Sequence, residues 1–501
     1  MSGTESGHGP HEPTSDRIIL ALACVAQFMV VLDVSVVNVA LPSIGRDLHY
    51  SPTGLQWVVN AYVLTFAGFL LLGGRAADLF GRRRTYIAGL ALFSLASLVG
   101  GFAQNSTWLT TARAVQGIGG ALLSPATLTI IVTTFSGARL ARALGLWSAV
   151  AGAGGAAGSI LGGVLTAQAS WRWVLFINVP IGIAVLVLAM RHLTELRRTE
   201  AAGRLDVAGA LTVTAGLAVL VYGIVGTDTH PWGSTQTLVT LAVAAVLLIA
   251  FAFIELRIAS TPLVPFRLFR SRSLSGANVV MLLIGAAFFC MWYFLSLYLQ
   301  NVLGFGALRA GLAFFPMAVS IIIGAQLSSR SLTRLGCRPL LFAGTLLAAG
   351  GFAWLSQIPA AGNYWEHVFG PGCVIALALG VLFTPLAAAA TAGVRPAEAG
   401  LASGVLNTSR QMGGSLGLAV LATVATDHTK SLLAGGSSAA AALSSGYGRA
   451  FAIAAGLAVT AFAVSFLVPN IGKPATNEAP AAETAGTAGR RSASALDPEP
   501  A

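Results

Sequence analysis

Three charged side chains stand inside stretches of sequence that are otherwise apolar, and they are Asp33, Arg113 and Arg410. A charge at the centre of a bilayer costs about 2.5–3.5 kcal/mol on insertion scales. Asp33 lies about eight residues from the end of its apolar run, and Arg113 lies about six residues from the start of another. If both runs are helices that cross a membrane in opposite directions, both charges lie roughly 10 Å below the same boundary. The spacing therefore predicts an ion pair, which would offset part of the insertion cost.

Two roles fit such a pair. A change in the neighbours of Asp33 would change its protonation, as a proton-coupled transporter requires. The alternative is a static ion pair that orders the helices. Arg410 lies about eight residues from the opposite boundary, so it either extends toward water or faces a cavity.

The composition places the chain in a membrane. Hydrophobic residues make up 55% and charged residues 9% of its 501 residues, whereas a soluble domain carries about 25% charged residues. A spanning helix needs about 20 mostly apolar residues. Such windows predict an all-α integral membrane fold with fourteen transmembrane helices, at residues 18–41, 52–72, 85–103, 107–132, 142–166, 172–191, 206–226, 236–256, 277–299, 308–328, 339–358, 367–391, 402–424 and 448–469.

The arginines indicate the orientation of these helices. Loops that follow even-numbered helices carry most of them, which places those loops and both chain termini in the cytoplasm. We therefore expect a multi-pass protein of the bacterial cytoplasmic membrane. The predicted order is a disordered tail (1–17), a six-helix bundle (18–191), linker loops with two inserted helices (192–276), a second six-helix bundle (277–470) and a second disordered tail (471–501).

Several functional classes are disfavoured by what the sequence lacks. Its four cysteines are scattered without the spacing of a metal site, and its two lysines stand outside any phosphate-binding loop motif. No combination of residues suggests a catalytic centre. We predict neither an enzyme nor an ATP-driven pump, with no metal, cofactor or nucleic-acid partner and with a monomer as the functional unit. A proton or sodium gradient is the remaining energy source.

An internal repeat relates the two halves. The segment GALLSP, residues 120–125, and the segment GVLFTP, residues 380–385, share a glycine, a hydroxyl residue and a proline in the same order. Each is followed by a loop that bears arginine and then by a glycine-rich helix. Two related bundles around a central site are how many secondary transporters are built.

The loop after the second predicted helix, GGRAADLFGRRRTYIAGL (residues 73–90), combines an acid with glycines and arginines at fixed offsets. This pattern resembles the signature loop of the major facilitator superfamily, whose members are built from such repeats. The resemblance implies that the acid pairs with an arginine and a helix end and so latches an inner gate. The second-half counterpart, residues 328–339, has Thr333 at the position of the acid. The residues of the first loop are Gly74, Asp78, Gly81, Arg82, Arg83 and Arg84.

The fifth predicted helix carries a series of glycines that resembles the antiporter signature of the same family, which is associated with exporters. Ser159 stands where that signature has a proline, so the expected kink is lost. A second interpretation needs no transport, because small residues along one face let any two helices pack closely. The matching residues are Gly145, Gly154, Gly158, Ser159, Gly162 and Gly163.

Three further segments, residues 32–48, 113–125 and 406–420, resemble motifs of the fourteen-helix drug:proton antiporters of this family, the multidrug-resistance type. The resemblance spans the membrane region and implies two bundles of six helices with two inserted helices between them. It further implies export driven by protons, with Asp33 and Arg113 in proton coupling and protons as the only coupling ion.

The predicted cargo is a hydrophobic or amphiphilic small molecule, such as a drug, an antibiotic or a secondary metabolite. The predicted helix 308–328 contains no acid, which favours neutral, zwitterionic or anionic cargo. An importer on the same fold, a membrane receptor that moves nothing and an enzyme acting on lipids are the alternatives. The predicted cavity residues are Gln116, Phe288, Trp292, Tyr293, Asn407, Arg410 and Gln411.

Overall fold

The structure is a computed structural model that describes residues 13–193, 205–227, 229–259, 262–264, 266–394 and 398–471. These residues form helices and loops without a strand, as predicted for segments that satisfy their own backbone polar groups in lipid. The helices are α1 Pro13–Asp47, α2 Trp57–Phe80, α3 Arg82–Gly101, α4 Ser106–Thr134, α5 Gly137–Gln168, α6 Trp173–Phe176, α7 Asn178–His192, α8 Val207–Gly226, α9 Thr235–Phe253, α10 Arg272–Leu297, α11 Ala307–Ala313, α12 Phe315–Leu335, α13 Cys337–Leu355, α14 Gly370–Thr391, α15 Ala399–Ala434 and α16 Ala439–Ser465.

Every one of the fourteen predicted windows contains a helix, with α6 and α7 sharing one window and α11 and α12 another. Twelve segments of the described chain are long and apolar enough to cross a membrane, and neither α5 nor α15 is among them. Both helices have the length, at 32 and 36 residues, but they are rich in glycine, alanine and polar residues. The count of fourteen spans stays a prediction.

The first helix begins earlier than its apolar run. It starts at Pro13, inside the segment predicted as a tail, whereas residues 1–12 lie outside the described part of the chain. Proline is favoured at the first helical position, and Asp16 stands in the first turn, where the helix dipole favours an acid. The second predicted tail lies almost entirely outside the described residues.

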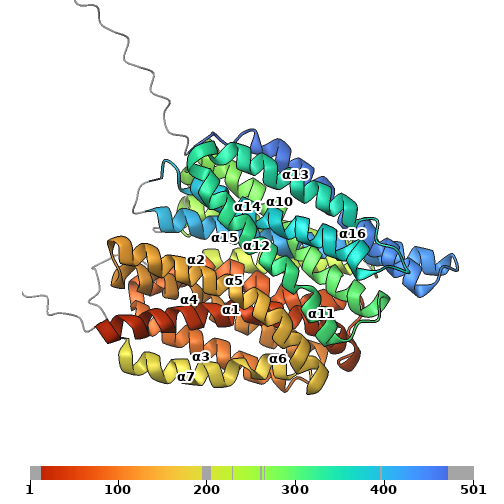
Figure 1. The fold of residues 1–501 in the computed structure, drawn as a ribbon, viewed down its shortest axis with the longest axis horizontal. Helices are drawn as coiled ribbons and strands as arrows, with labels where there is room; N and C mark the ends of the chain where they lie inside the picture. Colours follow the sequence, from red (N-terminus) through yellow and green to blue (C-terminus); the bar gives the residue numbers. More distant parts are fainter. Residues whose placement is uncertain are drawn as a thin grey trace, which may run out of the picture.

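The helices form two bundles with matching internal contacts (Figure 1). In the first, α1 packs on α5, α2 on α4, and α3 on both α4 and α7. In the second, α10 packs on α15, α12 on α14, and α13 on both α14 and α16. These are the same pairings in the same chain order, which supports the internal repeat seen in the sequence.

The helix pairs that join the two bundles include α2 with α15, α5 with both α11 and α12, α1 with α11, and α1 with α10. In the last pair, Ser296 Oγ donates to the Asn38 carbonyl at 2.8 Å. Gln300 Nε2, just beyond α10, donates to the Val39 carbonyl at 2.9 Å. The inserted helices α8 and α9 pack on each other, and α8 contacts α2 and α15, so the insertion lies at the seam between the bundles.

The first and last described residues lie at the same end of the molecule (Figure 1). We call it the terminal end, and the opposite end the distal end. Asp16 is bound there by Arg139, in the first turn of α5, at 3.3 Å. The Ile471 carbonyl accepts a hydrogen bond from the Cys337 N–H at 2.9 Å. The first and last described residues therefore share one side, and the location of both termini in the cytoplasm stays a prediction.

Equivalent turns separate the second and third helices of each bundle. Gly81 has φ 93° and Gly336 has φ 80°, a region that side chains other than glycine rarely enter. Two residues after each glycine, an arginine binds the last helix of its bundle. Arg83 Nη2 donates to the Met190 carbonyl at 2.9 Å, and Arg338 Nη2 donates to the Phe466 carbonyl at 3.0 Å. A cation at a helix C-terminus is favoured by the helix dipole.

We expect Gly81→Ala to lower the stability of the protein by about 1–3 kcal/mol, because alanine at this φ is strained. The melting temperature of the purified protein in detergent measures the loss. Gly74→Ala is the control in the same loop motif, since an added Cβ there would lie 3.8 Å from Pro125, an ordinary contact. Equal melting temperatures for the two variants would contradict the proposed backbone requirement.

Candidate functional site

Asp33 lies at the centre of a buried polar cluster that joins α1, α3, α4 and α7. Its Oδ2 atom is 2.6 Å from Arg113 Nη1, so the predicted ion pair is present. The exposed fractions of the two side chains are 0% and 2%, which means that neither reaches water. We call Asp33, Ser97, Arg113, Gln116 and Asn178 the Asp33 cluster.

Two side-chain amides complete the hydrogen bonding of the carboxylate. Gln116 Nε2 donates to Asp33 Oδ1 at 2.8 Å, and Asn178 Nδ2 donates to the same atom at 2.9 Å. Asn178 Nδ2 also donates to Ser97 Oγ at 3.0 Å. A buried carboxylate is tolerated only when opposite charge and hydrogen-bond donors replace water. Asp33 has all of these from two other helices, α4 and α7.

Arg113 has other contacts besides its ion pair with Asp33. Its Nε group donates to the Val58 carbonyl of α2 at 3.1 Å, and its Nη1 group donates to Gln116 Oε1 at 2.7 Å. Its guanidinium carbon lies 4.4 Å from the centre of the Tyr62 ring, in a cation–π contact. The arginine therefore ties α2 and α4 to the carboxylate of α1.

The sequence indicated only part of this cluster. Gln116 belongs to the cluster because it stands three residues after Arg113 on the same face of α4. Its predicted place in a substrate cavity stays a prediction. Asn178 and Ser97 were not predicted. Asn178 is the only amide residue in the apolar window 172–191, and this isolated amide was the signal that would have marked it.

The glycines of α5 pack this helix against its neighbours. A Cβ atom at Gly158 would lie 2.8 Å from the Leu32 carbonyl oxygen, and one at Gly162 would lie 2.8 Å from the Val36 carbonyl oxygen, both on α1. Gly154 meets the Phe28 carbonyl of α1 in the same way, at 3.0 Å. These three glycines form the close-packing face expected of small residues.

The other edge of α5 meets the second bundle. A Cβ atom at Gly163 would lie 2.7 Å from the Ala307 carbonyl oxygen of α11, and the Ser159 backbone abuts Gly311. Gly145 has nothing within 4 Å of an added Cβ atom. Within the antiporter-like series, Gly154, Gly158 and Gly162 therefore contact α1. Ser159 and Gly163 contact α11, and Gly145 has no close neighbour.

The structure describes the inner-gate loop in part. The side chain of Asp78 lies outside the described residues, so its predicted latch stays a prediction. Gly81 and Arg83 occupy the turn and the helix-end contact described above, and Gly74 lies in α2. Arg82 and Arg84 lie in the first turn of α3.

Each of the predicted aromatic cavity residues packs against another aromatic side chain. Phe288 lies 5.7 Å from Phe352 between ring centres, and Tyr293 lies 5.2 Å from Phe294. Trp292 is half-buried, with its ring centre 5.0 Å from that of Phe314. Their part in a substrate path stays a prediction, as do the parts of Asn407, Arg410 and Gln411 on α15.

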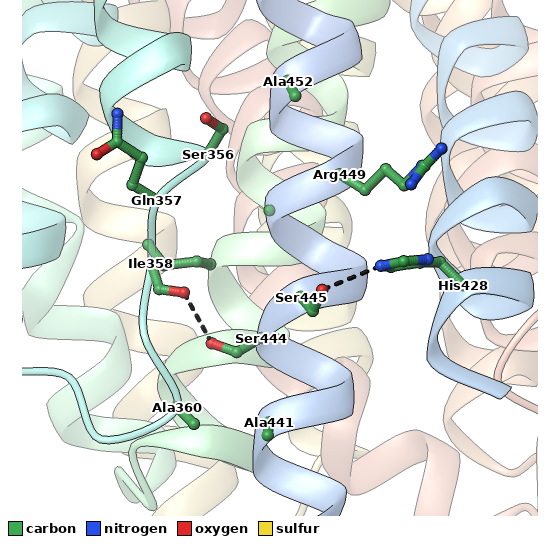
Figure 2. A pocket seen from close by; sticks show the side chains of 11 residues that line it. Ser356, Gln357, Ile358, Ala360, His428, Ala441, Ser444, Ser445, Arg449 and Ala452 are labelled. Carbon is green, nitrogen blue, oxygen red and sulfur yellow. Dashed lines mark hydrogen bonds between the residues drawn. The ribbon is translucent and has the colours of Figure 1, made fainter. Parts of the chain in front are cut away.

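A cavity of about 510 Å³ lies at the distal end of the second bundle, between α15, α16 and the loop after α13 (Figure 2). Ser444 Oγ donates to the Ile358 carbonyl at 3.1 Å, and His428 Nε2 lies 3.0 Å from Ser445 Oγ. Figure 2 shows that these contacts lie on different sides of α16. The cavity contains none of the predicted site residues.

The bundle repeat and the buried charge pair agree with the family comparison. The sequence matches the description Major Facilitator Superfamily over residues 23–418. The chain belongs to this superfamily. It is therefore a multi-pass membrane protein that transports a small molecule, and it is not an enzyme.

Two proteins similar to this chain have names that refer to antibiotics. The chain is 46% identical to the cephamycin export protein of Amycolatopsis lactamdurans, over 90% of this chain and 91% of that one. It is 40% identical to the puromycin resistance protein of Streptomyces alboniger, over 88% of each chain. Its fold is similar to the inward-facing, unoccupied crystal structure of a bacterial homologue of the human lysosomal transporter Spinster. That likeness has a TM-score of 0.65 and 16% identity, over 91% of this chain and 97% of that one.

We expect Gly158→Leu to destabilise the transporter by about 1–3 kcal/mol or more, because the side chain would overlap the backbone of α1. The yield of monodisperse protein from size-exclusion chromatography and its melting temperature measure this. Gly145→Leu is the matched control on the same helix, and we expect it to match the wild type. A Gly158→Leu protein as stable as this control would refute the close-packing role.

Proposed function

We propose that this chain is a proton-coupled antiporter that exports amphiphilic antibiotics or related metabolites across the bacterial cell membrane by alternating access. The observation that carries the proposal is the Asp33 cluster, in which a carboxylate is buried at membrane depth and accepts hydrogen bonds from the side chains of Arg113, Gln116 and Asn178. The names of the relatives, which concern cephamycin export and puromycin resistance, support the class of cargo. The resemblance to the fourteen-helix antiporter branch supports the direction.

The chemistry of the cluster explains how a proton would act. An ionised Asp33 accepts hydrogen bonds from Arg113, Gln116 and Asn178. Protonation removes the negative charge and converts one oxygen into a donor. Arg113 then has no counter-charge, and one of the amide donors competes with the new O–H group. The helices α1, α4 and α7 would therefore have a different preferred packing in the two protonation states.

The position of α1 connects this switch to the movement of the bundles. The same helix carries Asp33 and the carbonyls of Asn38 and Val39, which accept hydrogen bonds from Ser296 and Gln300 of the second bundle. These carbonyls lie five and six residues beyond Asp33, roughly 8–9 Å along the helix. A shift of α1 would alter the Asp33 cluster and this contact between bundles together.

The remaining features of the proposal follow the sequence. We propose fourteen spans with both termini in the cytoplasm, because α5 and α15 are long enough to cross a bilayer. The functional unit is a monomer, since one chain supplies both bundles. Protons are the only coupling ion, without a cofactor or ATP.

We expect Asp33→Asn to abolish the proton release that cargo drives, because asparagine keeps the hydrogen-bonding shape but cannot carry the proton. Inside-out vesicles with an acidic interior and a pH-sensitive dye would be challenged with cefoxitin, puromycin and ethidium. Wild-type protein should release protons with at least one compound, and the variant should match empty vesicles.

Asp47→Asn is the matched control, because Asp47 stands on the same helix but is 46% exposed and pairs with Arg172 at 2.6 Å. An exposed pair of this kind contributes little, so this variant should release protons normally. Equal release by wild type and Asp33→Asn would assign Asp33 a static role. Failure of all three compounds with the wild type would count against antiport and favour a receptor.

A further inference from the structure

Arg410 is a second arginine at membrane depth, but unlike Arg113 it has no acid. Its Nε and Nη2 groups donate to Asn407 Oδ1, one turn earlier on α15, at 3.2 and 2.8 Å. No carboxylate among the described side chains forms an ion pair with it. The side chain is half-buried, and its Nη1 group makes no hydrogen bond to the described protein, so donors remain available.

Arg410 lies deep along α15, inside the second bundle. Eleven residues separate it from the start of α15, which corresponds to about 16 Å along the helix. Its guanidinium carbon lies 6.0 Å from the centre of the Phe383 ring on α14. Its backbone lies against Gly285 of α10, where a Cβ atom would overlap the Arg410 carbonyl oxygen. The residue is thus fixed inside the second bundle.

No acidic residue of the second bundle forms an ion pair with Arg410 among the described side chains. Between residues 266 and 471 the sequence contains only Glu366, Glu398 and Asp427. Glu398 pairs with Arg267, and Glu366 lies 3.9 Å from His367 Nδ1. Asp427 has an interaction of its own near the distal end of α15. All three lie far along the chain from Arg410, at the borders of the bundle.

An arginine stays charged under these conditions, and a desolvated charge without a counter-ion is costly. Its planar fork of donors fits a carboxylate with two parallel hydrogen bonds. Asn407 occupies the Nε and Nη2 edge and leaves Nη1 available. The geometry therefore suits an anionic group that arrives from outside the chain.

We propose that Arg410 binds a carboxylate of the cargo, so that the transporter recognises amphiphilic anions. Asn407 orients the guanidinium, and the Phe383 ring offers an apolar surface beside it. The inference rests on the proposed export function and adds the chemical class of the cargo. The first bundle would then bind the proton, and the second would bind the anion.

A binding experiment with purified full-length protein in detergent tests this without a gradient. Cefoxitin, a cephamycin with a carboxylate, and its methyl ester would be titrated against wild type, Arg410→Gln and Arg410→Lys. Wild type should bind the acid about tenfold or more tightly than the ester, as expected for a charge-assisted hydrogen bond. Arg410→Gln should lose this preference, and Arg410→Lys should keep part of it.

Two further variants separate the possible failures. Arg449→Gln removes an exposed arginine of the same bundle, at the cavity of Figure 2, and should keep the preference. Asp47→Asn, at an exposed acid of the first bundle, should keep it too. Because the titration needs no gradient, loss of proton coupling would not affect the result.

Size-exclusion profiles show which variants are folded. If Arg410→Gln does not fold, a reduced preference of Arg410→Lys for the acid over the ester still tests the proposal. Three results would overturn the proposal: no binding of either compound by wild type, equal binding of both, or a preference that survives Arg410→Gln. A preference lost only in Arg449→Gln would overturn it as well, because it would move the anion site to the distal cavity.

Discussion

The rest of this structure depends on the burial of one carboxylate. Asp33 cannot be hydrated where it lies, so other helices have to supply an opposite charge and hydrogen-bond donors. Arg113 supplies the charge, while Gln116 and Asn178 supply the donors. The need to satisfy a single side chain thus fixes the relative positions of α1, α4 and α7. In the proposed coupling, one proton on Asp33 would weaken this cluster, because it would remove the charge that holds the cluster together.

Close packing acts on the other side of α1. The glycines of α5 bring its backbone against Leu32 and Val36, next to Asp33 in the sequence. The helix that carries the acid is therefore bound by polar contacts on one face and by backbone contacts on another. Since α5 also abuts α11, and α1 also bonds to α10, both helices belong to the contact between the bundles. Helix α1, which carries Asp33, and helix α5, which packs beside it, therefore also form part of the contact between the bundles.

The sequence predicted the parts of this arrangement that depend on position along one helix. Apolar windows located every helix, and the depth of Asp33 and Arg113 predicted their pairing. It did not predict Asn178 or Ser97, because the contacts of small polar residues are decided by which helices become neighbours. The bond of Gln116 to Asp33 follows from its spacing from Arg113, which puts it on the face of α4 that meets α1. Its predicted part in a substrate cavity stays a prediction. Neither α5 nor α15 is among the twelve described segments that are apolar enough to cross a membrane, because glycine and alanine take the place of large apolar side chains in these closely packed helices.

The two bundles repeat each other in packing but differ in charge. Equivalent helices make equivalent contacts, and Gly81 and Gly336 make equivalent turns. The first bundle nevertheless buries a neutral pair, Asp33 with Arg113, whereas the second holds Arg410 without a counter-charge. A neutral pair needs no further partner, and in the proposed mechanism a proton would open it. An unpaired cation such as Arg410 is stabilised when an anion binds, and the cargo would be that anion in one part of the transport cycle. If the proton and the cargo bind in different bundles, neither needs to displace the other directly. Their competition would then act through the helix contacts between the bundles, which is where α1 and α10 meet.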